Sequence, residues 1–146
     1  MPALPVAYRL SFDAAELDLA AIHAFLSQSY WSPDIPLDVV QRAVAGSQCA
    51  GLFHGAAQVG FARAVSDCAT FAYLADVYVL PEHRGQGLAQ AMVAGLMAQP
   101  ALQGLRRWML ATRDAHSLYA RLGFAPVSQP DRLMEIRKMN AYQAMS

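Results

Sequence analysis

Hydrophobic positions recur along this chain with two different periods. Short runs rich in β-branched and aromatic residues predict strands, whereas Leu19, Ile22 and Leu26 recur at helical spacing. The expected helices cover residues 13–29, 37–47, 87–99 and 114–124. The expected strands cover residues 7–12, 48–54, 58–67, 70–80, 105–112 and 133–139.

Local signals place the ends of several of these elements. Asp13 and Glu16 are spaced as a capping box for the first helix, and Pro81 ends the strand 70–80 because it has no N–H for a ladder. The helix 87–99 is apolar nearly all round, which implies burial against a sheet. The order β-α-α-β-β-β-α-β-α-β mixes hairpins with a crossover. It predicts one α/β domain over 1–146, with three layers (α/β/α) and a central mixed sheet.

Composition narrows the possible partners. The chain has 146 residues, 55% hydrophobic and 15% charged, with 11 basic and 11 acidic residues, so its formal net charge is zero. This balance argues against nucleic acid or an anionic membrane as the main partner. The first ten residues lack the pattern of a secretion signal, so we expect a cytoplasmic protein with Cys49 and Cys68 as buried thiols. Histidines and acids form no ligand-spaced cluster, and we expect no metal.

The segment "PEHRGQGLAQAM", residues 81–92, combines an arginine and two glycines before an apolar helix. The first N–H groups of a helix lack intrahelical partners and carry partial positive charge. Gly85 and Gly87 would let phosphate oxygens approach the backbone, and Arg84 could add a charge. The segment lacks the ending of a Walker loop. Taken alone, it is equally compatible with a tight turn that binds nothing.

Two motifs together resemble a known family. Arg84-x-x-Gly87-x-Ala89 is similar to the Q/R-x-x-G-x-G/A motif of the GCN5-related N-acetyltransferases. About thirty residues later, "HSLYARLGF" resembles the "lYxxxGF" signature of that family, with Tyr119, Gly123 and Phe124 in register. The order of the elements also matches. The resemblance implies a sheet that is largely antiparallel and splays between its fourth and fifth strands (the acyl-CoA N-acyltransferase fold), at a bulge.

The resemblance further implies that acetyl-CoA lies in this splay, between residues 70–79 and 106–111. The fourth strand would pair with the pantetheine arm, the glycine-rich loop would hold the pyrophosphate, and Thr112 stands where many relatives have Asn. A Thr hydroxyl replaces one amide hydrogen bond but not two. The cofactor residues implied in this way are Val77, Tyr78, Val79, Arg84, Gly85, Gln86, Gly87, Leu88, Ala89, Thr112, Asp114, His116 and Tyr119.

Three residues are candidates for the chemistry that the resemblance implies. Tyr119 would protonate the departing thiolate, although a tyrosine on this helix could instead pack its ring under the sheet. The backbone N–H of Tyr78 would stabilise the oxyanion. Asp76 could serve as the general base, since a carboxylate in an apolar run needs a partner. A structural Asp76, or a water held by it, explains the residue equally well.

The segment between the first two helices is where relatives recognise their acceptor. Here Tyr30 and Trp31 could wall an amine pocket and Asp34 could attract an ammonium, while Trp31 could equally plug the core. We expect an N-acetyltransferase that moves the acetyl group to a primary amine of a small molecule, by direct attack in a ternary complex. A protein or peptide acetyltransferase and a non-catalytic acyl-CoA-binding module are the alternatives. A homodimer is compatible with the exposed C-terminal segment 133–146.

Overall fold

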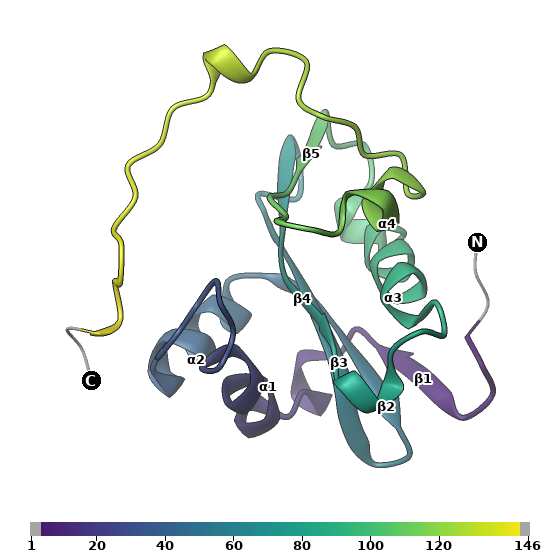
Figure 1. The fold of residues 1–146 in the computed structure, drawn as a ribbon. Coiled ribbons are helices and arrows are strands. Elements are labelled where there is room, and N and C mark those ends of the chain that lie inside the picture. Colours follow the sequence, from purple (N-terminus) through teal and green to yellow (C-terminus); the bar gives the residue numbers. More distant parts are fainter. Residues whose placement is uncertain (1–3, 144–146) are drawn as a thin grey trace.

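The fold is built on one mixed sheet of five strands (Figure 1). The computed structural model describes residues 4–143. The strands lie in chain order; the first four are antiparallel, and the fifth runs parallel to the fourth after a helical crossover. They are β1 (Tyr8–Ser11), β2 (Gln48–His54), β3 (Ala57–Ser66), β4 (Phe71–Val79) and β5 (Arg107–Met109).

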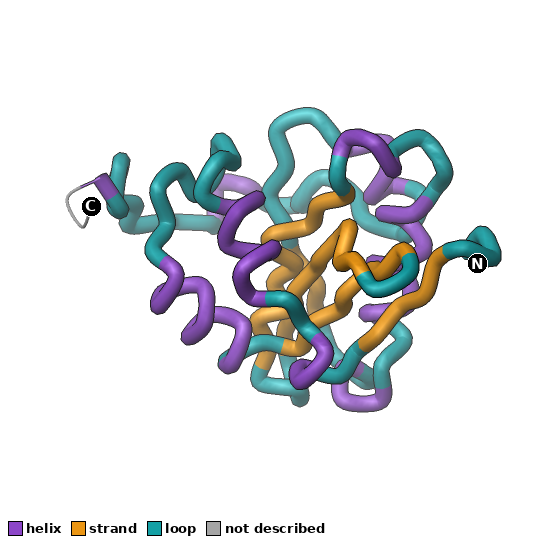
Figure 2. The backbone as a smooth tube through the Cα atoms, turned by 90° about the horizontal axis from the view of Figure 1, so that it is seen from below, coloured by secondary structure: helices purple, strands orange, loops and turns teal. Residues whose placement is uncertain are grey.

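Helices cover both faces of the sheet and give three layers, as predicted (Figures 1 and 2). One face carries α1 (Leu19–Leu26) and α2 (Leu37–Ala45), and the other carries α3 (Leu88–Met97) and the short α4 (His116–Ala120). Each interface has its own apolar cluster. Phe61 and Tyr78 point into the α1–α2 cluster, whereas Leu52 and Met92 belong to the α3 cluster. Side chains alternate between the two faces along a strand, so the same strand contributes residues to both clusters, as Tyr78 and Val79 do on β4.

The first predicted helix begins later than the sequence suggests. Residues 13–29 divide into a 3-10 turn, Ala14–Glu16, and the helix α1. Asp13 caps the short turn by accepting a hydrogen bond from the Ala15 N–H at 2.9 Å. Asp18 caps α1 in the same way, from the Ala21 N–H at 3.0 Å. A second Asp five residues along therefore starts the helix anew, since its side chain competes with continued helical bonding.

The last predicted strand is wrong as an element of this chain's own sheet. Residues 133–139 leave the domain as a single extended segment that pairs with no strand among residues 4–143 (Figure 1). Residues 144–146, which end the C-terminal segment 133–146, lie outside the described part. The sequence predicted an extended backbone here correctly, but a local pattern does not say which strand supplies the partner edge.

The two cysteines lie in different surroundings. Cys49 is buried on β2, and its burial raises the pKa of the thiol to about 11. Cys68 is exposed in the turn between β3 and β4, with φ of 60°, so its predicted burial is wrong. Within residues 4–143, no helix has the length and apolar character needed to cross a membrane.

Candidate active site

A bulge interrupts β4 at the centre of the sheet. Phe61 on β3 pairs with Tyr78, and Arg63 pairs with Ala75, so two steps on β3 match three on β4. The additional residue lies around Asp76, whose φ of 56° is in the left-handed region. Asp tolerates that conformation better than most residues. The bulge therefore bends β4 where the resemblance implies the reacting centre.

The sheet also opens at this point. β5 pairs with β4 only along Phe71–Tyr73, and the rest of β4 has no neighbour on that side. Leu80 donates its N–H to the Val59 carbonyl at 2.8 Å, which makes this a hydrogen-bonded pair. Because such pairs alternate along an antiparallel ladder, the N–H of Tyr78 also points toward β3. The backbone groups of Val77 and Val79 are left on the open side.

A cavity of about 950 Å³ occupies the splay. Its walls come from the end of β4, the start of α3, the α1–α2 loop and α4. Most of the predicted cofactor residues line it together: Val77, Tyr78, Val79, Arg84, Gly85, Gly87, Leu88, Ala89, Asp114 and Tyr119.

The glycine-rich loop presents backbone to this cavity. Gly85 and Gly87 have φ of 85° and 73°, a backbone region in which a residue with a side chain is strained. A Cβ on either glycine would meet no atom within 4 Å. Gly87 is the N-cap of α3 and supplies no side-chain cap. The first-turn N–H groups of α3 therefore face the cavity side without an intrahelical or capping partner. Arg84 fixes the loop by donating from Nε to the Val79 carbonyl at 2.8 Å.

Tyr119 is held by the turn that ends α4. Gly123 adopts φ of 96°, which reverses the chain, and the Phe124 N–H donates to the Tyr119 carbonyl at 3.1 Å. The Phe124 ring then packs edge-on against the Tyr119 ring, with centroids 6.0 Å apart. Burial, and secondarily the neighbouring Tyr30, raise the pKa of Tyr119 to about 12. Its phenol is therefore protonated at neutral pH and can donate a proton or a hydrogen bond.

Both carboxylate oxygens of Asp76 already accept hydrogen bonds. Trp31 donates from Nε1 to Oδ1 at 2.8 Å, and Arg63 donates from Nε to Oδ2 at 2.6 Å. The Asp76 side chain is only 7% exposed. The carboxylate thus ties the α1–α2 loop and β3 to the bulge. A carboxylate in an otherwise apolar strand is costly to bury unless it is paired and hydrogen-bonded. Asp76 is both, which is the structural role expected of an acid at this position.

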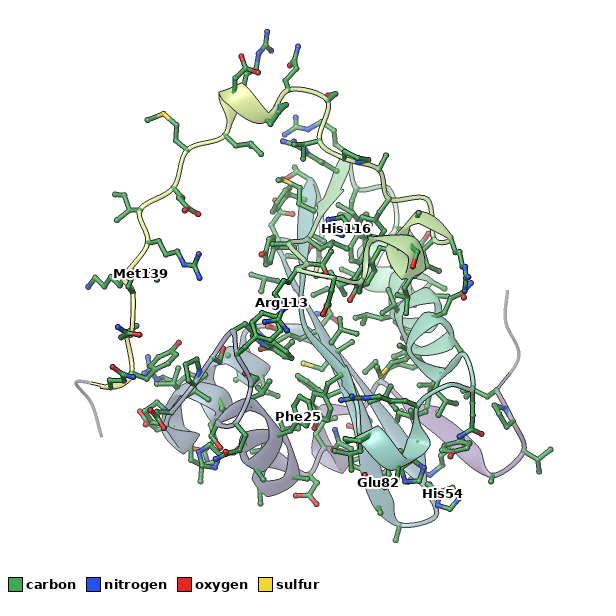
Figure 3. The ribbon with its side chains drawn as sticks, in the orientation of Figure 1. Phe25, His54, Glu82, Arg113, His116 and Met139 are labelled. Atoms are coloured by element: carbon green, nitrogen blue, oxygen red, sulfur yellow. The ribbon has the colours of Figure 1, made fainter. Side chains whose placement is uncertain are left out.

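A second cavity of about 600 Å³ adjoins the first on the other side of the bulge. Tyr30, Trp31, Val77 and Tyr119 line both, so the two cavities meet at the splay. The Arg113 guanidinium lies over the Tyr30 ring at 3.8 Å, a cation–π contact that joins the α1–α2 loop to the start of α4. In Figure 3, Arg113 lies near the middle of the molecule, between α1 and β4.

Five of the predicted residues do not line the first cavity, and one of them, Asp76, lines the second. Gln86 turns its amide toward Tyr8 and the His83 carbonyl. Thr112 lines the second cavity, where its Oγ1 accepts the Ala115 N–H at 3.0 Å. His116 and Asp34 line neither cavity. In Figure 3, His116 lies near β5 and α4.

Sequence reasoning missed eight residues of the first cavity, and three of them carry a charge or an aromatic ring. Arg113 and Arg121 add positive charge near α4, and Phe25 stacks on Tyr78 with ring centroids 3.9 Å apart and planes 8° from parallel. Burial raises the pKa of Tyr78, and the charges of Asp18 and Asp76 add to the rise. Arg121 is two residues after Tyr119 in the "YARLGF" signature, and this position could have indicated that it lines the cavity. Among the described residues, no three His, Cys, Asp or Glu side chains gather as a metal site.

The splayed sheet and the cavity lined by its backbone are the features of the acyltransferase class that the resemblance implies. Comparison with known proteins then specifies the family. The family description "Acetyltransferase (GNAT) domain" matches residues 46–126. A protein of Gibberella zeae, described as a candidate acetyltransferase, is 37% identical over 137 residues, covering 78% of this chain and 76% of its own. The chain therefore belongs to the GNAT acetyltransferase family.

Solved structures give the same result. A candidate acetyltransferase of the GNAT family from Xanthomonas campestris pv. campestris is 52% identical, with a TM-score of 0.90 over 97% of this chain and 98% of its own. A candidate acetyltransferase from Clostridium acetobutylicum, solved with acetyl-CoA, is 16% identical, with a TM-score of 0.66 over 89% of this chain and 94% of its own. At that identity the likeness concerns the fold alone.

Proposed function

We propose that this protein transfers the acetyl group of acetyl-CoA to a primary amine of a small molecule, in a ternary complex of both substrates. The observation that carries the proposal is the meeting of two cavities at the bulge of β4. One cavity offers backbone, a helix N-terminus and arginines, and the other offers the acids Asp76, Asp114 and Glu135 beside aromatic walls that the two cavities share. Two substrates approaching from opposite sides would meet between Val77 and Tyr119.

The residues of the first cavity fit acetyl-CoA. Its pantetheine arm carries amides that can pair with the backbone groups of Val77 and with the N–H of Val79, in the manner of an added strand, while the Val79 carbonyl is already bonded to Arg84. Its pyrophosphate suits the N–H groups at the start of α3. Arg84, Arg113 and Arg121 line the cavity against a single acid, Asp114, which favours a polyanion. The Clostridium acetobutylicum protein of the same fold was solved with this molecule.

The chemistry follows from which groups face the splay. The neutral amine attacks the thioester carbonyl carbon, the carbonyl oxygen gains negative charge, and the carbon–sulfur bond then breaks. Since the N–H of Tyr78 belongs to the β3 ladder, we assign the oxyanion donor to the N–H of Val77, beside the bulge. Tyr119, protonated at neutral pH, donates to the departing thiolate sulfur.

Asp76 acts in this proposal as a positioning residue. Its two oxygens hold Trp31 and Arg63, so it shapes both the bulge and the wall of the acceptor cavity. The amine proton passes to water, which the second cavity admits beside the bulge. Trp31 accordingly has both roles that the sequence left open, as a wall of the cavity and as a member of a buried network.

The proposed function is tested by thiol release from acetyl-CoA with a panel of acceptors. The panel contains small aliphatic and aromatic primary amines, a lysine peptide, and a secondary and a tertiary amine as controls. We expect release that saturates with at least one small primary amine, and an N-acetylated product by mass spectrometry. Release only with the lysine peptide would favour a protein acetyltransferase. Tight acetyl-CoA binding with no acetylated product from any acceptor would contradict the enzyme.

Asp76→Asn separates positioning from base catalysis. Asparagine tolerates the left-handed backbone and still accepts the Trp31 hydrogen bond, but it loses the charge that pairs with Arg63. We expect kcat/KM to fall by less than about tenfold, with the acid limb of the pH profile retained, because proton removal itself is not lost. Stability should fall by about 1–3 kcal/mol in chemical denaturation.

Asp114→Asn is the matched control, because this exposed acid lines both cavities without holding the bulge. It should leave stability unchanged. If Asp76→Asn instead lowered kcat by more than about 100-fold and removed the acid limb, Asp76 would be the base.

A further inference from the structure

Arg63 is a mostly buried arginine whose guanidinium is only partly engaged. Its side chain is 19% exposed and lies beside the bulge of β4. Nε donates to Oδ2 of Asp76 at 2.6 Å, and Nη1 donates to Oγ of Ser47 at 3.2 Å. Among residues 4–143, no hydrogen bond or ion pair engages Nη2. Two of the three guanidinium nitrogens are therefore fixed, and the third is available to a ligand.

The available nitrogen is exposed to the second cavity. Arg63 lines that cavity. Within the described part of the chain, no buried side-chain nitrogen or oxygen lacks a hydrogen-bond partner, so Nη2 must be accessible to solvent. The cross-strand partner of Arg63 is Ala75, which also lines the second cavity. Because its methyl group is too small to cover a guanidinium, Ala75 leaves this nitrogen open.

The formal charges of the second cavity cancel. Three arginines and three acids line it: Arg63, Arg113, Arg137, Asp76, Asp114 and Glu135. A dianion such as a phosphate ester requires a surplus of positive charge, which this lining does not provide. A molecule that carries one ammonium and one carboxylate is also neutral overall and finds a partner for each charge.

Aromatic rings lie on either side of the Arg63 guanidinium. Trp31 donates to the same carboxylate of Asp76 as Arg63 does, so its ring lies close to the guanidinium. Tyr73 lies on the same face of the sheet, two residues along β4 from Ala75. Both rings are partly exposed and line the second cavity. Such rings pack well on methylene groups, which suits a carbon skeleton that joins two charged ends.

We propose that the acceptor is an amino acid, whose primary amine enters the splay while its carboxylate binds Nη2 of Arg63. This inference rests on the function proposed above and names its substrate class. A carboxylate accepts N–H groups of a guanidinium in strong, charge-assisted hydrogen bonds. Because Asp76 and Ser47 already hold the guanidinium, little conformational freedom is lost when the carboxylate binds. Arg63 is thus a specificity-determining residue.

The carboxylate exchanges no atom in the reaction. The amine nitrogen forms its bond to the acetyl carbon, the carbon–sulfur bond breaks, and Tyr119 protonates the thiolate sulfur. The amine proton passes to water. The products are an N-acetylated amino acid and CoA, and the carboxylate serves only to hold the acceptor.

Matched acceptors test the substrate class on the wild-type protein. Thiol release compares amino acids that have one to five carbons between amine and carboxylate with the corresponding amino amides. At the best spacer length, kcat/KM should be at least about tenfold higher for the acid, because the amide lacks the charge that pairs with the guanidinium. O-phosphoethanolamine replaces the carboxylate by a phosphate and should be a poorer acceptor than the best amino acid.

Two substitutions test whether Arg63 is the carboxylate anchor. Arg63→Lys keeps the positive charge beside Asp76 but has a single nitrogen, which that carboxylate occupies. Ala75→Leu keeps the ion pair and covers the guanidinium from the neighbouring strand. Each should lower the ratio of kcat/KM between acid and amide toward one. Arg42→Lys is the matched control and should keep the wild-type ratio, since Arg42 is exposed and lines neither cavity.

Isothermal titration separates this inference from the proposed function. Each amino acid is titrated into protein saturated with CoA, which has no acetyl group to transfer. Binding that is lost with the amide and in Ala75→Leu supports the carboxylate site, even if thiol release fails and the proposed function with it. Equal thiol release with acids and amides keeps the proposed function and overturns this inference. A preference for the phosphate, no binding of any amino acid, or loss of the preference in Arg137→Gln but not in Arg63→Lys also overturns it.

Discussion

Tyr119→Phe is expected to lower kcat for acetyl transfer by about 100- to 1000-fold while leaving the Kd for acetyl-CoA nearly unchanged. The substitution removes only the phenol oxygen, and the ring keeps its packing against Phe124. Without the phenol, the thiolate leaves without a proton or a hydrogen bond. Steady-state kinetics and isothermal titration measure the two quantities separately. Tyr142→Phe is the control, since Tyr142 packs on the α1–α2 cluster away from both cavities.

The pH dependence of the same variant checks the role of the proton. The pKa of Tyr119 is about 12, so the wild-type phenol keeps its proton throughout the usual assay range. The kcat profiles of wild type and variant should therefore run parallel between about pH 6 and about pH 9. Unchanged turnover would make Tyr119 a packing residue only.

The raised pKa of Tyr119 also predicts how the stability of the fold depends on pH. Because the folded pKa lies above the ordinary value of a tyrosine, the stability that Tyr119 contributes is fully present below about pH 10. It is lost as the pH rises through about 12, where the folded protein also gives up the proton. Tyr119→Phe should reduce this alkaline loss.

Much of the fold could be predicted because its signals are local. The aromatic and β-branched run ending at Pro81 gave β4, and the all-round apolar segment gave the buried helix α3. The glycine-rich loop was found because only glycine is at ease at the positive φ of positions 85 and 87. These features depend on neighbours within a few residues, which a single sequence displays.

The features that the sequence left open concern partners that are distant in the sequence. Nothing near Asp76 says that its carboxylate is shared between Trp31 and Arg63, 45 and 13 residues away. The choice between the N–H groups of Tyr78 and Val77 as oxyanion donor depends on the β3–β4 register, which the bulge shifts by one residue. The segment 133–139 was predicted to be a strand, but it pairs with no strand among residues 4–143. Local sequence patterns predict the conformation of a segment, whereas the role of a residue depends on its contacts with residues far away in the sequence.

Gly87→Glu is expected to weaken acetyl-CoA binding by about 100-fold or more, measured by isothermal titration. The new carboxylate would stand at the N-cap of α3, where a Cβ meets open space, and would occupy and repel the proposed pyrophosphate position. A helix N-terminus tolerates an acid well, so the loss comes from competition with the phosphates rather than from an unfolded helix.

Backbone strain is separated from anion exclusion by Gly104→Glu. Gly104 has φ of 74°, almost the same as Gly87, also with open space around its Cβ, but it lines neither cavity. Both variants should lose similar stability, about 1–2 kcal/mol. Only Gly87→Glu should lose acetyl-CoA. S-acetylpantetheine, which lacks the pyrophosphate, should bind Gly87→Glu and wild type equally, since its amides need only Val77 and Val79. Equal weakening of both ligands would mean that the loop shapes the channel without holding phosphate.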